Sequence, residues 1–244
     1  MKKNLTTFVA GLVSAVVLIG GVFAVPAQAA AATAGTTTTE QQYKIALEDA
    51  FFPNDPGFSK NGANIDKQWG LIKANFPQAW TKTTGSKKVI IAVIDTGLDG
   101  THEDFQGSKL KTGYNVLTHK SMSGRSNSDD NGHGTLITGV IAAVADNDQG
   151  VAGAAFDVSI MPIKALNSSG SGSSSAIAEA IIWAADHKAD VINLSLGGMG
   201  FAHDKVLANA ITYAFDKNVV IVAAAGNDVA ITGGNLDKEP VFPI

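Results

Sequence analysis

Four short apolar runs recur through the second half of the chain. They span residues 88–94, 158–164, 189–195 and 218–225 and are rich in valine and isoleucine. Apolar residues do not alternate with polar ones in these runs, which is typical of strands buried on both faces of a sheet. The pattern therefore predicts four strands in the interior of one sheet.

Helical patterns fill the intervals between these runs. Apolar residues recur at helical spacing in 133–145, in 174–187 and from Val206 to Phe215. Strand and helix therefore alternate, which predicts βαβ units and a parallel sheet. The predicted fold is α/β, a three-layer doubly wound parallel sheet. In such a sheet ligand groups gather beyond the carboxyl ends of the strands.

The amino terminus follows a different pattern. Two lysines precede a long uncharged apolar stretch, which Pro26 ends, and residues 27–29 read Ala-Gln-Ala. Residues 1–29 are therefore predicted to be a secretory signal peptide. An uncleaved membrane anchor is the alternative, because the stretch approaches the length that spans a bilayer. Residues 30–50 are predicted to be a leader, and we expect a secreted protein without stable membrane association after cleavage.

Composition excludes several other classes of protein. A chain of 244 residues that is 45% hydrophobic can bury a sizeable core and is not a disordered chain. The absence of cysteine excludes disulfides, thiolate metal sites and a cysteine nucleophile. A net charge of −4 with no basic run gives no support for nucleic-acid binding. No phosphate-binding loop is present, so a nucleotide-binding α/β protein is not favoured.

Two polar residues stand at positions suited to catalysis. Asp95 ends the first apolar run, where a buried carboxylate is costly unless it is hydrogen bonded or paired with a charge. His133 begins a predicted helix, and a helix N-terminus favours the neutral imidazole, which can accept a proton. Taken alone, each could have a structural role, as a turn cap or a packed side chain. In this order they fit two members of an Asp-His-Ser relay.

Four segments, in this order, resemble the subtilisin-like serine proteases (subtilases). They are IAVIDTGLDGTHEDF, DDNGHGTLITGVIAAV, INLSLGG and VVIVAAAGN. The likeness covers roughly residues 51–230 and is greatest to the thermitase branch of the family. It implies a subtilisin-like fold, with 51–244 as a partial peptidase domain that is incomplete at its C-terminus. It also implies a secreted, monomeric serine endopeptidase that acts on proteins or peptides.

The same resemblance implies roles for individual residues. Asp95 would orient His133, which would take a proton from a serine and return it to the leaving amine. Asn227 would stabilise the oxyanion. An extended peptide would lie between two walls of a cleft by strand addition, with an open pocket that favours large apolar side chains. The residues implied in substrate binding are Gly170, Gly172, Ser195, Leu196, Gly197, Ala224, Ala225 and Gly226.

A structural calcium site is also implied by the resemblance. Calcium binds oxygen ligands that come from separate segments of a chain. The implied ligands are the side chains of Asp55, Asp104 and Asn147 and the backbone carbonyls of Val144, Gln149 and Val151. A solvated acidic loop is the alternative reading of the aspartates near Asn147. Because the chain cannot form disulfides, bound calcium would stabilise its fold instead.

The sequence departs from the family at the nucleophile. The family's G-T-S-M-A motif is missing, and no serine follows Asn227 before the last residue, Ile244. We therefore expect this chain to be the amino-terminal part of a longer protease, inactive as written and poorly folded in isolation. A non-catalytic, subtilase-like peptide-binding protein is the alternative. Leu136 stands where the family has a second histidine, with an expected consequence for packing only.

Overall fold

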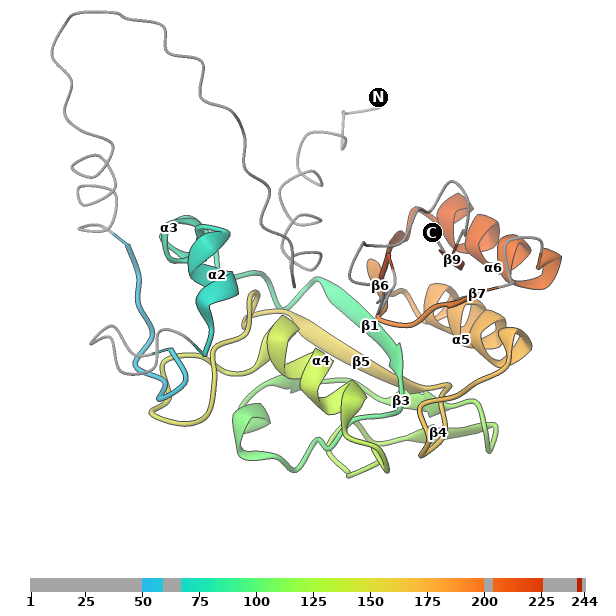
Figure 1. Ribbon diagram of the computed structural model, residues 1–244, viewed down its shortest axis with the longest axis horizontal. Coiled ribbons are helices and arrows are strands. Elements are labelled where there is room, and N and C mark those ends of the chain that lie inside the picture. The colour runs from blue at the N-terminus through green and yellow to red at the C-terminus, as the bar shows by residue number, and fades with distance from the viewer. Residues whose placement is uncertain (1–49, 59–66, 200–203, 226–240, 243–244) are drawn as a thin grey trace, which may run out of the picture.

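The computed structural model describes residues 50–58, 67–199, 204–225 and 241–242. In this part of the chain, seven strands form a central sheet with the order β4-β3-β5-β1-β6-β8, and β2 pairs with β5 beside β3 (Figure 1). Its strands are β1 (Ile90–Asp95), β2 (Lys109–Leu110), β3 (Gly113–Asn115), β4 (Lys120–Met122), β5 (Ser159–Lys164), β6 (Val191–Leu194) and β8 (Val220–Ala223). A separate two-stranded sheet pairs β7 (Gly198–Met199) with β9 (Val241–Phe242). The predicted signal peptide and nearly all of the predicted leader lie outside the described residues.

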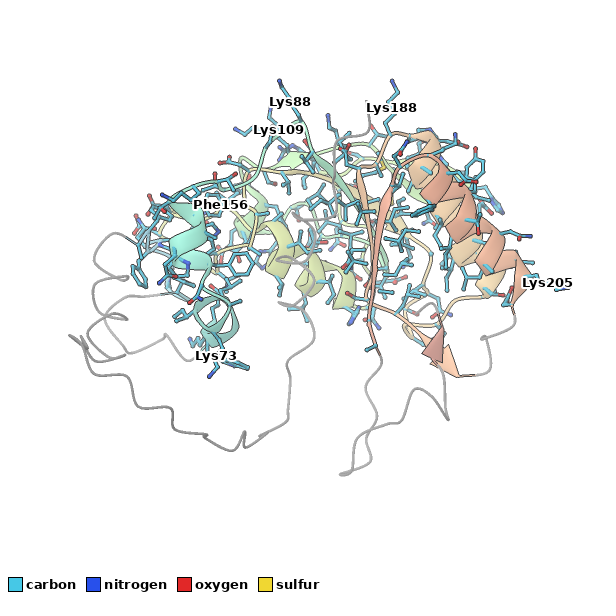
Figure 2. The ribbon with its side chains drawn as sticks, turned by 90° about the horizontal axis from the view of Figure 1, so that it is seen from above. Lys73, Lys88, Lys109, Phe156, Lys188 and Lys205 are labelled. Carbon is cyan, nitrogen blue, oxygen red and sulfur yellow. The ribbon has the colours of Figure 1, made fainter. Side chains whose placement is uncertain are left out.

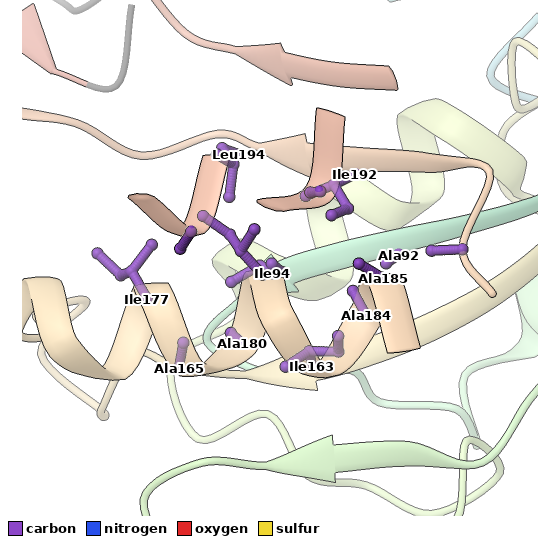
Figure 3. Packing of buried hydrophobic residues seen from close by; sticks show 14 of the residues in the cluster. Ala92, Ile94, Ile163, Ala165, Ile177, Ala180, Ala184, Ala185, Ile192 and Leu194 are labelled. Carbon is purple, nitrogen blue, oxygen red and sulfur yellow. The ribbon is translucent and has the colours of Figure 1, made fainter. Parts of the chain in front are cut away.

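Helices cover both faces of the sheet. They are α2 (Trp69–Lys73), α3 (Phe76–Trp80), α4 (His133–Ala142), α5 (Ser174–Asp186) and α6 (Lys205–Asp216), with a 3₁₀ turn, η2, at Glu103–Phe105. Successive residues of β1 point to opposite faces. Ile91 and Val93 pack in the cluster that holds Ala142 of α4, whereas Ala92 and Ile94 belong to the cluster on the other face, which contains residues of α5 and α6. Figure 3 shows Ala92 and Ile94 beside the buried residues of α5. The predicted three-layer α/β fold is therefore confirmed.

The strand directions agree with the prediction except at one margin. β1 pairs in parallel with β5 and β6, and β6 pairs in parallel with β8. β3 and β4, however, form an antiparallel hairpin that the sequence pattern did not indicate. His119, at the end of the turn between them, has a φ of 53°, which lies in the left-handed region. The sheet is thus mostly parallel, with an antiparallel strand at its edge.

Pro162 interrupts the sheet on one side of β5. β2 pairs with Ser159 and Ile160, and β3 pairs with Ile163 and Lys164. Proline has no backbone N–H to donate to a neighbouring strand. The neighbouring chain therefore leaves β5 between β2 and β3 and returns beyond the proline.

The two ends of the parallel strands differ in chemistry. Lys88 lies before β1, Lys109 begins β2 and Lys188 lies before β6, and all three lie along one side of the molecule (Figure 2). The opposite, carboxyl ends of β1 and β5 carry Asp95 and Lys164, which are both buried. Ligands of parallel sheets bind beyond the carboxyl ends of the strands, so these buried charged groups indicate a functional site at this edge.

The amino-terminal helices pack through aromatic side chains. Trp80 of α3 lies 5.4 Å from the ring of Phe58 and 5.7 Å from that of Phe156, measured between centroids. Its indole N–H donates to the carbonyl of Ala154 at 2.9 Å. This cluster fixes residues 50–58 against the loop that follows α4. Within the described ranges, the helices are too short or too polar to cross a membrane.

Candidate active site

Asp95 and His133 form a hydrogen-bonded pair at the carboxyl edge of the sheet. Asp95 is the last residue of β1 and is fully buried, and His133 is the first residue of α4. The Nδ1 atom of His133 lies 2.8 Å and 3.0 Å from the two carboxylate oxygens of Asp95. The backbone N–H of Thr96 donates to the same carboxylate at 2.7 Å. With Nδ1 engaged, the other ring nitrogen of this half-exposed histidine is left for proton exchange.

A network centred on Asp129 holds the ends of β1 and α4 together. Its carboxylate accepts hydrogen bonds from the hydroxyls of Thr96 and Thr135, at 2.8 Å and 2.6 Å, and from the backbone N–H groups of Asn131, Gly132 and Thr135. Burial alone would raise the pKa of Asp129, but the hydrogen bonds from Thr135, Gly132 and Thr96 outweigh it. Together they hold the pKa of Asp129 well below its usual range.

Gly134 allows α4 to approach β1 closely. A Cβ atom at this position would lie 2.2 Å from the carbonyl oxygen of Gly97 and 3.1 Å from the Cβ of Asp95. The backbone N–H of Gly134 donates instead to the hydroxyl of Thr96 at 2.9 Å. The H-G-T motif therefore places the histidine ring on the aspartate because its second residue has no side chain.

Lys164 is a buried cation beside this pair. It ends β5 in register with Asp95, and its side chain is 6% exposed. Its ammonium donates to the carbonyls of Thr96 and Leu166 and to the carboxylate of Asp130, which itself is half exposed. The carbonyl of Asp95 in turn accepts from the N–H groups of Ala165 and Leu166, at 2.9 Å and 3.1 Å.

The two predicted walls of the substrate cleft border one pocket. Gly170 and Gly172 approach it from the loop before α5, and Leu196 and Gly197 approach it from the segment after β6. Its volume is about 210 Å³. Its apolar lining consists of Leu166, Ile177, Leu196 and Leu207.

The remaining predicted substrate residues lie near the ends of β6 and β8. Ser195 follows β6, and its hydroxyl accepts from the side-chain amide of Asn193 at 3.0 Å. Ala224 is bonded to Leu194 through its backbone N–H, and Ala225 follows it; both are half-buried. Gly226 and the predicted oxyanion donor Asn227 lie outside the described residues.

The residues implied in calcium binding are also brought together. Asp55 is fully buried and accepts from the backbone N–H of Asp146 at 2.8 Å. Asp104 accepts from the N–H of Val151 at 3.2 Å, and its own carbonyl accepts from Val144 at 2.8 Å. The amide oxygen of Asn147 accepts from the N–H of Gln149 at 3.0 Å. The loop after α4 therefore wraps around both carboxylates.

The charge of these two carboxylates is only weakly compensated in the described part of the chain, where His102 lowers the pKa of Asp104 slightly. Neither Asp55 nor Asp104 forms an ion pair there, and one oxygen of Asp104 is buried without a hydrogen-bond partner. Burial raises the pKa of both groups, which hydrogen bonds from backbone N–H groups only partly offset. A bound cation would compensate such a pair. Carbonyl oxygens would have to complete its shell, because the residues described hold no cluster of three or more acidic or histidine ligands.

Sequence reasoning missed Asp129, Asp130 and Lys164. The signal for Lys164 was a lysine at the end of an otherwise apolar buried strand, where a charge needs partners. The signal for Asp129 was an acidic residue just before a helix start, where it can accept from free N–H groups. Both features were present in the sequence, but the identity of their partners depends on the folded chain.

The fold and this site define an α/β protein with an Asp-His pair beside an apolar pocket that could receive a peptide side chain. A model of the subtilase family matches residues 86–243. The chain therefore belongs to the subtilase family. Thermitase of Thermoactinomyces vulgaris is 41% identical over 177 residues, which are 72% of this chain and 58% of thermitase. A thermophilic serine proteinase of Bacillus sp. (strain AK1) is 42% identical over 183 residues, 75% of this chain and 42% of that protein.

Solved structures show the same relationship. A protease from Pseudoalteromonas arctica PAMC 21717 superimposes with a TM-score of 0.61 at 33% identity, covering 73% of this chain and 60% of that one. Fervidolysin from Fervidobacterium pennivorans, a keratinolytic enzyme related to subtilisin, has a TM-score of 0.61 at 32% identity, covering 75% and 28%. The chain spans about half the length of the curated relatives it matches.

Proposed function

We propose that this chain is the amino-terminal part of a secreted serine endopeptidase that cleaves proteins or peptides. The observation that carries the proposal is the hydrogen bond between buried Asp95 and His133 in a chain of the subtilase family. A carboxylate on Nδ1 fixes the ring and stabilises its protonated form, so the other nitrogen can accept a proton from a serine hydroxyl. The pair would then return that proton to the leaving amine.

The serine itself is not part of this proposal for residues 1–244. No serine follows Asn227, and Ser195 belongs to the cleft wall, with its hydroxyl bonded to Asn193. The catalytic serine is therefore not assigned to any residue of this chain. Asn227 would supply the oxyanion donor. The 244 residues by themselves are expected to form no acyl-enzyme.

We propose that the cleft binds the peptide through backbone hydrogen bonds and apolar pockets. The pocket between the two glycine-rich walls would take one apolar side chain, because four aliphatic residues line it. The pocket for the residue before the cleaved bond would involve Ala224, Ala225 and Gly226, whose small size favours large apolar side chains. Short peptides that differ only at that residue test the second point, and a preference for lysine or aspartate there would contradict it.

We propose calcium as the structural ion between Asp55 and Asp104. Two buried carboxylates without an ion pair, one with an unpartnered oxygen, support this proposal. Asn147 and the carbonyls of Val144, Gln149 and Val151 would complete the oxygen shell. A bound calcium would stabilise the loop after α4 and, through Asp104, the turn η2.

A non-catalytic peptide-binding role is the second candidate. It is supported by one observation, because residues predicted for both cleft walls line one pocket without any contribution from Asp95 or His133. The two candidates differ in whether a reactive serine is ever present. Reading the coding sequence past Ile244 for an in-frame G-T-S motif separates them first.

The decisive test uses the protein that the complete coding sequence produces. A serine-directed fluorophosphonate should label it, and the His133→Ala variant should be labelled far more slowly, because the serine then lacks its base. Lys217→Met, which removes a surface cation far from the pair along the chain, should be labelled at the normal rate. A protein that binds peptides but is never labelled would contradict the endopeptidase and support the binding protein.

A further inference from the structure

Lys164 satisfies each of its three ammonium N–H donors with an acceptor from a different segment. The Nζ atom lies 2.6 Å from the carbonyl oxygen of Thr96, 2.6 Å from a carboxylate oxygen of Asp130 and 3.0 Å from the carbonyl oxygen of Leu166. A lysine ammonium carries three donors and no acceptor. The group is therefore fully bonded while its side chain is almost completely removed from water.

Each acceptor belongs either to a segment that carries Asp95 or His133 or to the lining of the apolar pocket. Thr96 directly follows Asp95, and Asp130 lies in the loop that leads to His133. Leu166 lines the apolar pocket. The N–H of Leu166 also donates to the carbonyl of Asp95 at 3.1 Å, so the pocket residue is bonded to the Asp95–Thr96 segment through both its N–H and its carbonyl.

Stability alone does not call for a charge at this position. Removing an ammonium from water costs several kcal/mol, and replacing a buried ion pair with apolar residues is often neutral or stabilising. An unbranched apolar side chain such as methionine would fill the same path beside β1 and β5. What it could not do is bind three carbonyl or carboxylate oxygens from separate segments at once.

We propose that Lys164 is a positioning residue that fixes the apolar pocket relative to the Asp95–His133 pair. This inference rests on the proposed function, in which the pocket binds a substrate side chain. A substrate side chain bound in the pocket contacts and shifts Leu166. Because Lys164 is hydrogen bonded to Leu166, Thr96 and Asp130, this shift also moves Thr96 and Asp130. Occupation of the pocket and the geometry of the histidine are then coupled through one ammonium group.

The test follows the ring N–H of His133 by NMR in the protein that the complete coding sequence produces, labelled with ¹⁵N-histidine. In Lys164→Met, exchange of this proton with water should be about tenfold faster, the factor that corresponds to losing one hydrogen bond to a charged group. Addition of a blocked hexapeptide with one phenylalanine among alanines should shift the His133 signal in the unsubstituted chain and leave it unshifted in the variant. The all-alanine hexapeptide should shift neither.

The matched control is Lys217→Met, which removes the ammonium of the other lysine ion pair in the described residues, the surface pair with Asp186. It should leave both readouts unchanged. If Lys164→Met is folded, lowers only the melting temperature and leaves exchange at His133 unaltered, Lys164 is a structural staple and the proposal is wrong. If Lys164→Met does not fold, Asp130→Asn is measured in its place, because it weakens only the half-exposed ion pair between Asp130 and Lys164. Unaltered exchange at His133 in that variant overturns the proposal.

Loss of the proposed peptide site and loss of the coupling through Lys164 give different results. If the phenylalanine peptide shifts no signal in the unsubstituted chain, the pocket is not a peptide site and the proposed function is contradicted. The exchange rate at His133 without peptide still reports on Lys164 in that case. A shift that persists in Lys164→Met keeps the proposed function and overturns the coupling.

Discussion

The hydroxyl of Thr96 donates to Asp129 at 2.8 Å and accepts from the N–H of Gly134 at 2.9 Å. These two bonds join the strand that ends in Asp95 to the helix that begins with His133. Both partners of the pair are therefore placed by backbone segments that a fully buried threonine links.

Replacing Thr96 with valine should remove both hydrogen bonds that join β1 to α4 and lower the free energy of unfolding. The substitution keeps the shape but leaves the N–H of Gly134 without its partner, at a cost of about 1–3 kcal/mol in the free energy of unfolding. Urea unfolding of the protein that the complete coding sequence produces measures this loss. Thr101→Val, where an exposed hydroxyl bonds to Asp99, should cost much less. Equal losses in the two variants would count against a special role for Thr96.

Asp129 should make the site sensitive to acid. Its pKa in the folded chain lies below the ordinary value of 3.8, so its contribution to stability is complete above that value and is lost as the pH falls toward the folded-state pKa. Unfolding at about pH 6 and about pH 3 should show a smaller loss in Asp129→Asn than in the unsubstituted chain. An identical acid sensitivity in both chains would show that other carboxylates cause it.

Two glycines of α4 offer opposite outcomes for the same substitution. Gly134→Ala places a methyl group on the carbonyl of Gly97 and should destabilise by about 1–3 kcal/mol while disturbing the Asp95–His133 bond. Gly139→Ala meets nothing within 4 Å and should stabilise the helix by about 0.5–1 kcal/mol. Thermal unfolding and the His133 NMR signal distinguish them. A Gly134→Ala variant that is as stable as the unsubstituted chain would contradict the close approach inferred at Gly134.

Calcium should stabilise the chain through Asp104. At a hundredfold excess over its dissociation constant, an ion bound only by the folded state adds about 2.7 kcal/mol. Adding a chelator should lower the melting temperature of the unsubstituted chain but not that of Asp104→Asn. Asp157→Asn, which alters a carboxylate bonded to Thr84, should keep the calcium response. A melting temperature indifferent to the chelator in every chain would remove the proposed site.

The rim of the apolar pocket can be filled without changing Asp95 or His133. Ser174 lines the pocket, and its neighbour Ser175 does not. Ser174→Phe should weaken binding of the phenylalanine hexapeptide about tenfold or more, because the pocket of about 210 Å³ is then occupied. Ser175→Phe should bind it normally. A peptide titration followed at His133 gives both affinities, and equal weakening would move the binding site elsewhere.

The sequence predicted the interior of the sheet more closely than its margins. The runs at 88–94 and 158–164 became β1 and β5 within two residues, because continuous valine and isoleucine leave few alternatives to a buried strand. The short strands β2, β3 and β4 have no such pattern, and their pairing depends on the hairpin and on Pro162. Such tertiary pairing cannot be read from local periodicity.

The candidate site shows the same division. The motifs around Asp95 and His133 are local, so their roles could be expected before any geometry was known. Lys164 is separated by 68 residues from Thr96 and by 34 residues from Asp130 in the sequence. Partners so far apart cannot be predicted from a local sequence pattern. The residues that support the Asp95–His133 pair are therefore the ones that only the folded chain identifies.

The antiparallel hairpin at the margin of the sheet bears on association between copies of the chain. β4 is three residues long, stands at the end of the strand order and begins with exposed Lys120. A short edge strand that carries a lysine is a poor template for strands from another molecule. This edge of the sheet thus discourages association of separate copies of the chain by edge-to-edge strand pairing.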